Sequence, residues 1–166
     1  RTAALQVTLQ DRAHRFLLWR IWDWATPPLG FVMLNPSTAD ETRDDPTTVR
    51  NMARARRLGY GGVIQANLYS YRTPSPAALK AAGYPGGPAS PGNEAAILRL
   101  FETCADVVLA WGARARPSDA VDFTMAIQGK TWSPRRLLHL GRLKNGMPRH
   151  PLMTAYDVPL QEWGRR

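Results

Sequence analysis

The sequence predicts an α/β fold: a three-layer α/β/α sandwich with a mainly parallel central sheet. Short apolar runs typical of buried strands alternate with segments typical of helices, as in parallel sheets covered on both faces. Several of these runs stop abruptly at polar or turn residues. Within Gly30–Asp40, the apolar run Phe31–Leu34 ends at Asn35, Pro36 and Ser37. Ligands of open α/β sheets bind at such strand ends, so this segment is the first candidate for a site.

The length of 166 residues predicts a single α/β domain over residues 1–166. We expect an N-terminal hairpin over about residues 5–28, a core over about 29–153 and a short C-terminal tail. The hairpin is predicted because Arg15–Trp24 is rich in apolar and aromatic residues and is followed by the turn signal Pro27-Pro28. It is expected to add an antiparallel edge to the sheet.

The net charge of +9 comes mostly from arginine, with 19 arginines against 3 lysines. Arginine binds phosphate in a bidentate way, so nucleic acid is a reasonable partner; a bias in genome composition would raise the arginine content equally. The single cysteine, Cys104, excludes an internal disulfide, an iron–sulfur cluster and a zinc finger. With no signal peptide and no apolar stretch of membrane-spanning length, we expect a cytoplasmic monomer without membrane association, metal or cofactor.

The first helix is predicted from Asp45, which can cap it, and Pro46, which suits a first helical turn. It is expected to run to Leu58 and to stop at Gly59. Arginines spaced i, i+4 and i+7 give this helix one basic face, which is either a solvated face or a phosphate contact. These arginines are Arg50, Arg54 and Arg57.

The later elements follow from the same signals. Ser75-Pro76 opens a short helix through Ala82, and Gly83 closes it. The Pro- and Gly-rich segment Tyr84–Gly92 is predicted to be a loop. The remaining predicted elements are the strand Val63–Ala66, the helix Asn93–Thr103, the strand Val107–Trp111, a helix over about Ser118–Gln128 and the strand Arg136–Leu140.

Three strand ends present polar groups: Asn35 with Ser37, Asn67 with Tyr69, and the segment Arg149–Met153. An asparagine at a strand end is often only a turn residue, and a lone histidine is more often structural, as we expect for His14 and His139. His150 differs because it lies between two prolines in a rigid turn. Trp111 is expected to be a core residue rather than a pocket wall.

These strand ends resemble the motifs of the uracil-DNA glycosylase superfamily. Phe31–Ser37 resembles the first motif in the Asn-Pro form of the mismatch-specific uracil/thymine branch, and Gly62–Arg72 resembles the central strand whose terminal asparagine reads the base. Val107–Gly112 resembles the strand before the final helix, and His150–Leu152 the closing His-Pro motif. More narrowly, LNPSTAD, DDPT, NLYSYR, AWG and RHPL resemble an uncharacterised bacterial and phage domain family, from about Arg15 to Met153.

The resemblance implies a uracil-DNA-glycosylase-like fold and a monofunctional DNA N-glycosylase. Such an enzyme flips uracil or a 5-substituted uracil, such as 5-hydroxymethyluracil or mismatched thymine, out of DNA and hydrolyses its N-glycosidic bond. Asn35 would position water and His150 would stabilise the leaving base. Because the first position is an amide, a neighbouring carboxylate, Asp40, Asp44 or Asp45, is a candidate auxiliary acid.

The base pocket implied by the resemblance contains Asn67, which would read the pyrimidine edge, together with Pro36, Ser37 and Tyr69. The uracil-selective branch has a tyrosine where this chain has Ser37, so room at carbon 5 of the base is expected. The implied DNA contacts are Arg50, Arg54, Arg57 and Arg149, with Leu152 or Met153 as the apolar wedge.

Three other functions remain open. One is a non-catalytic module that binds a flipped or modified pyrimidine in the same pocket. Another is a transferase that modifies pyrimidines in phage DNA, for which the sequence offers no glycine-rich nucleotide loop. The last is a small-nucleotide hydrolase, which would need clustered carboxylates for a metal site that the sequence does not show.

Overall fold

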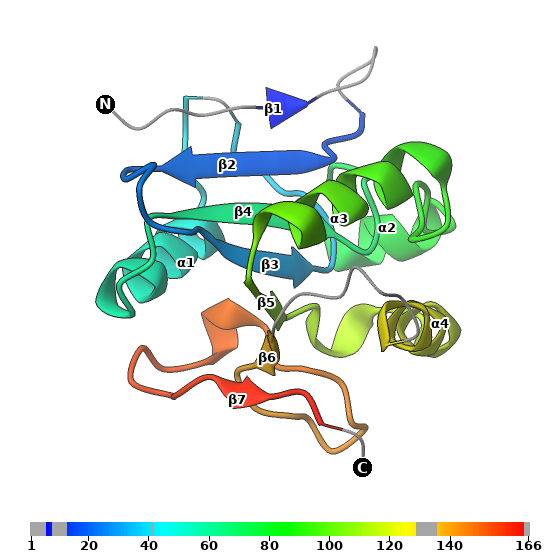
Figure 1. The fold of residues 1–166 in the computed structure, drawn as a ribbon. Helices are drawn as coiled ribbons and strands as arrows, with labels where there is room; N and C mark the ends of the chain where they lie inside the picture. The colour runs from blue at the N-terminus through cyan, green and yellow to red at the C-terminus, as the bar shows by residue number, and fades with distance from the viewer. Residues whose placement is uncertain (1–5, 8–12, 41, 129–135, 165–166) are drawn as a thin grey trace.

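The computed structural model describes residues 6–7, 13–40, 42–128 and 136–164 and is built on one seven-stranded sheet (Figure 1). The strand order is β1-β2-β4-β3-β5-β6-β7. The central strands β4, β3, β5 and β6 are parallel, whereas β1, β2 and β7 pair in antiparallel fashion at the edges. The strands are β1 Gln6–Val7, β2 Leu17–Ile21, β3 Leu29–Met33, β4 Gly62–Asn67, β5 Asp106–Leu109, β6 Arg136–His139 and β7 Gln161–Glu162.

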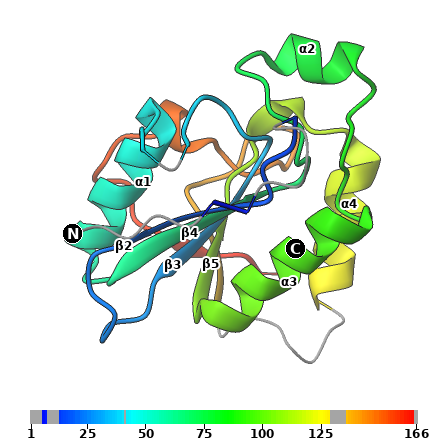
Figure 2. The ribbon, with the colours of Figure 1, turned by 90° about the horizontal axis from the view of Figure 1, so that it is seen from above.

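Helices cover both faces of this sheet (Figure 2). Helix α1 packs on one face, over a core that includes Phe31 and Val63; α3 and α4 pack on the other, over a core that includes Ile64 and Leu100. The predicted α/β fold with a mainly parallel sheet is therefore confirmed. The helices are α1 Pro46–Arg57, α2 Pro76–Ala81, α3 Pro91–Thr103 and α4 Pro117–Gln128, with the 3-10 turns η1 Gly112–Arg114 and η2 Pro151–Met153.

No helix in the described ranges is both long and apolar enough to cross a bilayer.

The helix boundaries follow the predicted caps. The Asp45 side chain accepts a hydrogen bond from the Thr48 N–H at 2.8 Å, and the Ser75 hydroxyl accepts one from the Ala78 N–H at 3.1 Å. Helix α3 begins two residues before the predicted start at Asn93, because Pro91 suits a first helical turn.

The predicted N-terminal strand, β2, does not form a hairpin with the next strand, β3. β2 is antiparallel as expected, but its partners are β1 and β4, and β4 separates it from β3. The turn after β2 is fixed against Gly61, whose carbonyl accepts hydrogen bonds from the N–H groups of Trp22 and Asp23. A Cβ at Gly61 would overlap the carbonyl oxygens of Asp23 and Thr26, so the close approach requires glycine. Residues 5 and 8–12 of the predicted hairpin lie outside the described residues.

Asn93 joins α3 to the end of β4. It is fully buried, and its amide nitrogen donates to the carbonyl oxygens of Asn67 and Leu68, at 3.0 and 2.9 Å, and of Gly86 at 3.1 Å. Asn67 ends β4, and Leu68 and Gly86 lie outside it, so the Asn93 side chain supplies donors to carbonyls at the point where the strand stops.

Asn93→Ala is expected to lower the free energy of unfolding by about 2–3 kcal/mol, because it leaves buried carbonyl groups without a donor. Urea unfolding followed by circular dichroism measures the change. The control on the same helix is Arg99→Ala, which removes only an exposed pair with Glu102 at 4.0 Å and is expected to change the free energy by less than about 0.5 kcal/mol. Equal effects of the two variants would contradict this account.

Candidate functional site

A cleft of about 680 Å³ opens at the carboxyl ends of β3 and β5. The crossover from β3 through α1 leads to β4 on one side of β3, and the crossover from β4 through α3 leads to β5 on the other. The two connections diverge at the end of β3, which leaves a crevice there. The cleft therefore occupies the place where open α/β sheets bind their ligands.

The cleft brings together residues from both halves of the sequence. The segment after β3 and the start of α1 form one part of its wall, and the segments after β5 and β6 form another. Many of the predicted site residues therefore share one space. They are Asn35, Ser37, Asp45, Arg149, His150, Leu152 and Met153.

Asn35 fixes the wall that follows β3. Its amide nitrogen donates to the carbonyl oxygens of Thr73 at 2.8 Å, Pro36 at 3.0 Å and Tyr71 at 3.3 Å. The Thr73 N–H in turn donates to the Pro36 carbonyl at 2.9 Å. The nitrogen of Asn35 is thus committed to the backbone, and its side-chain oxygen is the atom left to face a ligand. Pro36 is buried in this junction and does not line the cleft.

His150 reaches the cleft because the segment Gly141–Arg149, which lengthens the link from β6, folds back on itself. The Arg149 N–H donates to the Gly141 carbonyl at 2.9 Å, and the Leu143 N–H donates to the Met147 carbonyl at 2.8 Å. Gly112 allows the close approach: its φ is +74°, and an added Cβ would lie 3.3 Å from the Cβ of His150.

The His150 ring is held in one orientation. Its Nδ1 accepts a hydrogen bond from the Leu152 N–H at 3.3 Å, so the neutral ring carries its proton on Nε2. Burial lowers the pKa of His150, and the charge of Asp45 opposes this effect. A neutral imidazole with a free Nε2–H can donate a hydrogen bond to a carbonyl oxygen in the cleft.

Of the three candidate auxiliary acids, Asp45 alone lines the cleft. Asp40 accepts two backbone N–H groups in an exposed turn, and these bonds lower its pKa to about 2. Asp44 pairs with Arg20, with 2.7 Å between Oδ1 and Nε. The structure does not bring Asp40 or Asp44 to the cleft, whereas Asp45 both caps α1 and faces the ligand space.

Two residues of the implied base pocket lie elsewhere. Tyr69 is buried on the sheet face that α3 and α4 cover, and its hydroxyl donates to Asp119 at 2.6 Å. Asn67 is only 1% exposed, does not line the cleft, and has no hydrogen-bond partner for either amide atom. Asn67 is the last residue of β4 and Tyr69 follows the strand, and both side chains are packed inside the fold rather than in the cleft.

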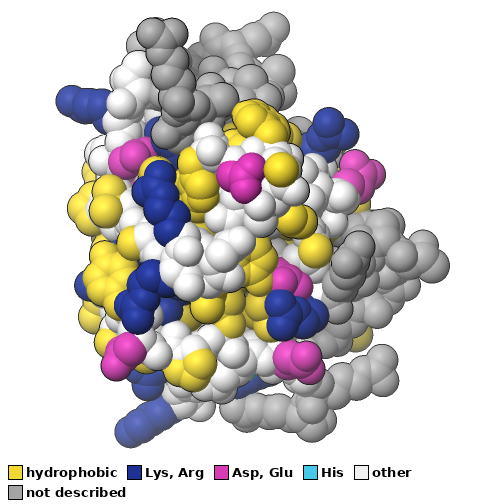
Figure 3. All heavy atoms as spheres, turned by 60° about the vertical axis from the view of Figure 1, so that its left-hand side comes forward, with side chains coloured by type: hydrophobic (Ala, Val, Ile, Leu, Met, Phe, Trp, Pro, Cys, Tyr) yellow, Lys and Arg dark blue, Asp and Glu magenta, His cyan; other side chains and the backbone are white. Residues whose placement is uncertain are grey.

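Two of the three arginines on the basic face of α1 make structural contacts, and Arg54 is too buried for the DNA contact predicted for it. Arg54 is 3% exposed and donates to the carbonyl oxygens of Ala155, Tyr156 and Val158, at 3.0–3.2 Å. Arg50 donates to the Thr154 carbonyl at 2.7 Å and stacks on Tyr156. Arg57 is exposed. On the side of the molecule where α1 lies, the basic side chains form separate patches rather than one strip (Figure 3).

Several cleft residues, among them Arg15, Thr47 and Arg114, were not among the predicted site residues. Thr47 belongs to the DDPT motif and Arg114 follows the AWG motif, but no role was predicted for either residue. Trp111 is a core residue, as predicted, and also forms part of the cleft wall. The DDPT motif, which places Thr47 in the first turn of a predicted helix, is the signal that pointed toward this part of the site.

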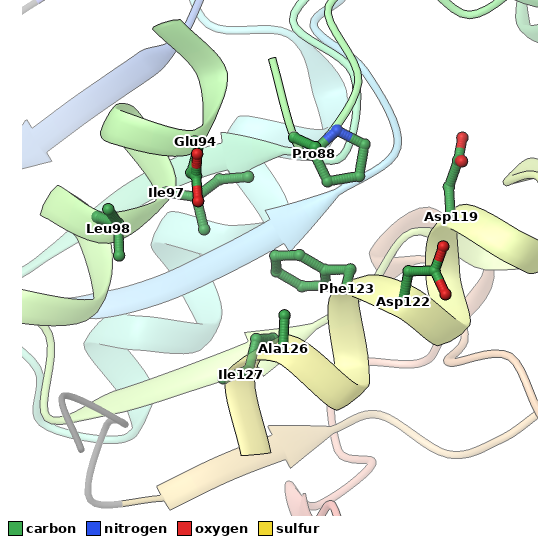
Figure 4. A pocket seen from close by; sticks show the side chains of 10 residues that line it. Pro88, Glu94, Ile97, Leu98, Asp119, Asp122, Phe123, Ala126 and Ile127 are labelled. Atoms are coloured by element: carbon green, nitrogen blue, oxygen red, sulfur yellow. The ribbon is translucent and has the colours of Figure 1, made fainter. Parts of the chain in front are cut away.

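A second, smaller cleft of about 230 Å³ lies between α3 and α4 (Figure 4). Ile97 from α3 and Phe123 from α4 lie on its two sides, and Asp119 and Asp122 lie at its edge. Its lining is largely apolar, and it contains none of the residues predicted for the site.

The protein family described as "Protein of unknown function (DUF1643)" matches residues 15–152 of the chain. The match covers the parallel strands, α1 and nearly all of the larger cleft. No curated protein and no solved structure matches the chain.

Arg54→Ala is expected to lower the free energy of unfolding by about 2–3 kcal/mol, because three backbone carbonyls lose their donor. The matched control is Arg57→Ala on the exposed part of the same helix, with an expected change below about 0.5 kcal/mol. Urea unfolding compares the two. Similar changes would show that Arg54 does not hold the C-terminal segment.

The lowered pKa of His150 predicts a pH dependence of stability. Below the ordinary value of 6.5, the unfolded chain binds a proton at this site that the folded protein resists, so stability falls as pH falls from 6.5 to the folded pKa. His150→Gln is expected to weaken this dependence, while His139, whose pKa burial also lowers, contributes equally to both proteins. Unfolding at about pH 7.5 and about pH 5.5 tests it; an unchanged difference would contradict the prediction.

Proposed function

The chain belongs to the DUF1643 family of proteins of unknown function, and we propose that its larger cleft is the active site of a DNA N-glycosylase. The proposed substrate is uracil or a 5-substituted uracil flipped out of DNA, and the proposed fold relationship is to the uracil-DNA glycosylase superfamily. The observation that carries the proposal is that Asn35 and Ser37, from the first motif, share a cleft with His150, from the last.

The chemistry of the reaction matches the groups available. Cleavage of the bond between base and sugar places positive charge on the sugar and negative charge on the departing base. His150, neutral and with its proton on Nε2, is suited to donate a hydrogen bond to the base carbonyl as charge develops there. The side-chain oxygen of Asn35 would hold the attacking water, since its nitrogen is bound to the backbone.

Asp45 is the carboxylate we assign to this water. It lines the cleft with Asn35 and His150, and its charge acts on His150. Proton transfer to a positioned carboxylate typically contributes about 10²–10⁴-fold in rate. Asp45 would accept the proton from the attacking water, a role that the amide of Asn35 cannot fill.

Base selection falls to the groups that line the cleft. We do not assign the reading of the pyrimidine edge to Asn67, because it is buried away from the cleft. Ser37 is half-buried in the cleft wall and small, so it leaves room beside carbon 5 of the base. A substrate with a 5-substituent would therefore fit.

A non-catalytic binder of flipped pyrimidines is the second candidate, and one observation favours it. The amide nitrogen of Asn35 is committed to three backbone carbonyls, so Asn35 already has a structural role that needs no catalysis. In this case the cleft would hold the base without breaking its bond to the sugar.

The test uses end-labelled duplexes that contain uracil, mismatched thymine or 5-hydroxymethyluracil, treated with alkali after incubation. We expect strand cleavage at uracil and at one or more of the 5-substituted bases. His150→Gln and Asp45→Asn, which keeps a capping side chain, should each lower the rate by about 10²-fold or more. Asp40→Asn, outside the cleft, is the matched control and should retain the wild-type rate.

The outcomes separate the candidates. DNA binding without cleavage of any duplex would favour the binder, and cleavage at uracil alone would contradict the role assigned to Ser37. Equal loss of activity in the Asp40 and Asp45 variants would contradict the role assigned to Asp45.

A further inference from the structure

We propose that the larger cleft contains a phosphate site formed by Arg15, Ser37 and the first turn of α1, so that its ligand is a nucleotide rather than a nucleoside or a free base. The inference names the substrate class of the function proposed above, and its link to a pyrimidine rests on that function.

The burial of Arg15 without an ion pair points to an anionic ligand. Its side chain lines the cleft yet is only 2% exposed. One nitrogen, Nη1, donates to the Ala39 carbonyl, and Nε has no hydrogen-bond partner. Among the described residues Arg15 forms no ion pair, although Asp45 is near enough for its charge to be felt. A buried guanidinium that forms no ion pair is costly unless an anionic ligand supplies the opposite charge.

Burial lowers the pKa of Arg15 to about 10, and neither the charge of Asp45 nor that of Asp40 cancels this effect. The guanidinium still carries its charge at neutral pH. A phosphate in contact with Arg15 would restore the favourable environment that burial removes.

The start of α1 supplies further donors beside Arg15. Helix α1 has 12 residues, and its cap pairs the Thr48 N–H with Asp45. Pro46 has no N–H, which leaves the Thr47 N–H as a donor at the positive end of the helix. In the described part of the chain, neither the Thr47 nor the Ser37 hydroxyl has a hydrogen-bond partner, and both residues line the cleft.

The charge balance of the cleft also favours an anion. Asp45 is the one carboxylate among the described lining residues, against three arginines, one buried and two at exposed positions. These arginines are Arg15, Arg114 and Arg149. The geometry fits the phosphate of a free nucleotide or a phosphodiester of DNA, and the test separates these sources.

The experiment measures binding, not turnover. Isothermal titration compares 2′-deoxyuridine 5′-monophosphate, 2′-deoxyuridine and inorganic phosphate, together with a single-stranded DNA trinucleotide that has 2′-deoxyuridine at its centre. We expect the monophosphate or the trinucleotide to bind at least about tenfold more tightly than the nucleoside, a difference of about 1.4 kcal/mol. The tighter of the two identifies the source of the phosphate.

Substitutions test which residues bind the phosphate. Arg15→Gln should abolish the preference for the phosphorylated ligand, whereas Arg99→Gln, the same charge change on an exposed residue outside the cleft, should leave it intact. Because Arg15 is buried, the double variant Ser37→Ala/Thr47→Ala provides a second test in a folded protein, and it should weaken phosphate binding by about threefold or more.

Equal binding of nucleoside and monophosphate by the wild-type protein would overturn the proposal, as would equal losses in the Arg15 and Arg99 variants. Phosphate preference without cleavage of any duplex would leave the site standing and remove the glycosylase. Cleavage of a duplex without a preference for phosphate would support the glycosylase and remove the phosphate site.

Discussion

The central position of β3 determines where this protein can bind a ligand. Because β4 and β5 flank β3, the crossovers through α1 and α3 cover opposite faces and separate at its carboxyl end. Asn35 keeps this gap open by binding backbone carbonyls of the neighbouring loop rather than continuing the strand. The cap of α1, the turn that contains His150 and the buried Arg15 all reach the same space as a result.

The parts of the fold that sequence predicted depend on short-range signals. Asp45 and Ser75 cap their helices within three residues, and apolar runs bounded by turn residues mark the parallel strands. The meeting of Asn35 with His150 was predictable too, because the ends of parallel strands converge at one edge of a sheet. Helical spacing, however, shows only which residues share a face. It could not show that the face of Arg54 is covered by a segment about 100 residues later in the chain.

Arg15 and Tyr69 illustrate why the rest of the site could not be predicted. The position of Arg15 depends on the pairing of β2 with β4, a contact between distant segments that local pattern does not specify. Tyr69 lies just beyond the end of β4, but its side chain packs into the core under α3 and α4, where its hydroxyl donates to Asp119. A buried arginine without an ion pair weakens folding, and such costs are typically retained where a ligand offsets them.

The C-terminal segment has a mechanical consequence for the cleft. Arg50 and Arg54 of α1 donate hydrogen bonds to the backbone of residues 154–158, and β7 then pairs with β6 (Figure 1). This one segment therefore connects the two sides between which the cleft opens. Separating the two sides of the cleft would break these bonds. The segment therefore favours a preformed space over a hinged closure, and a ligand bound there would impose only a small entropic cost of ordering on the protein.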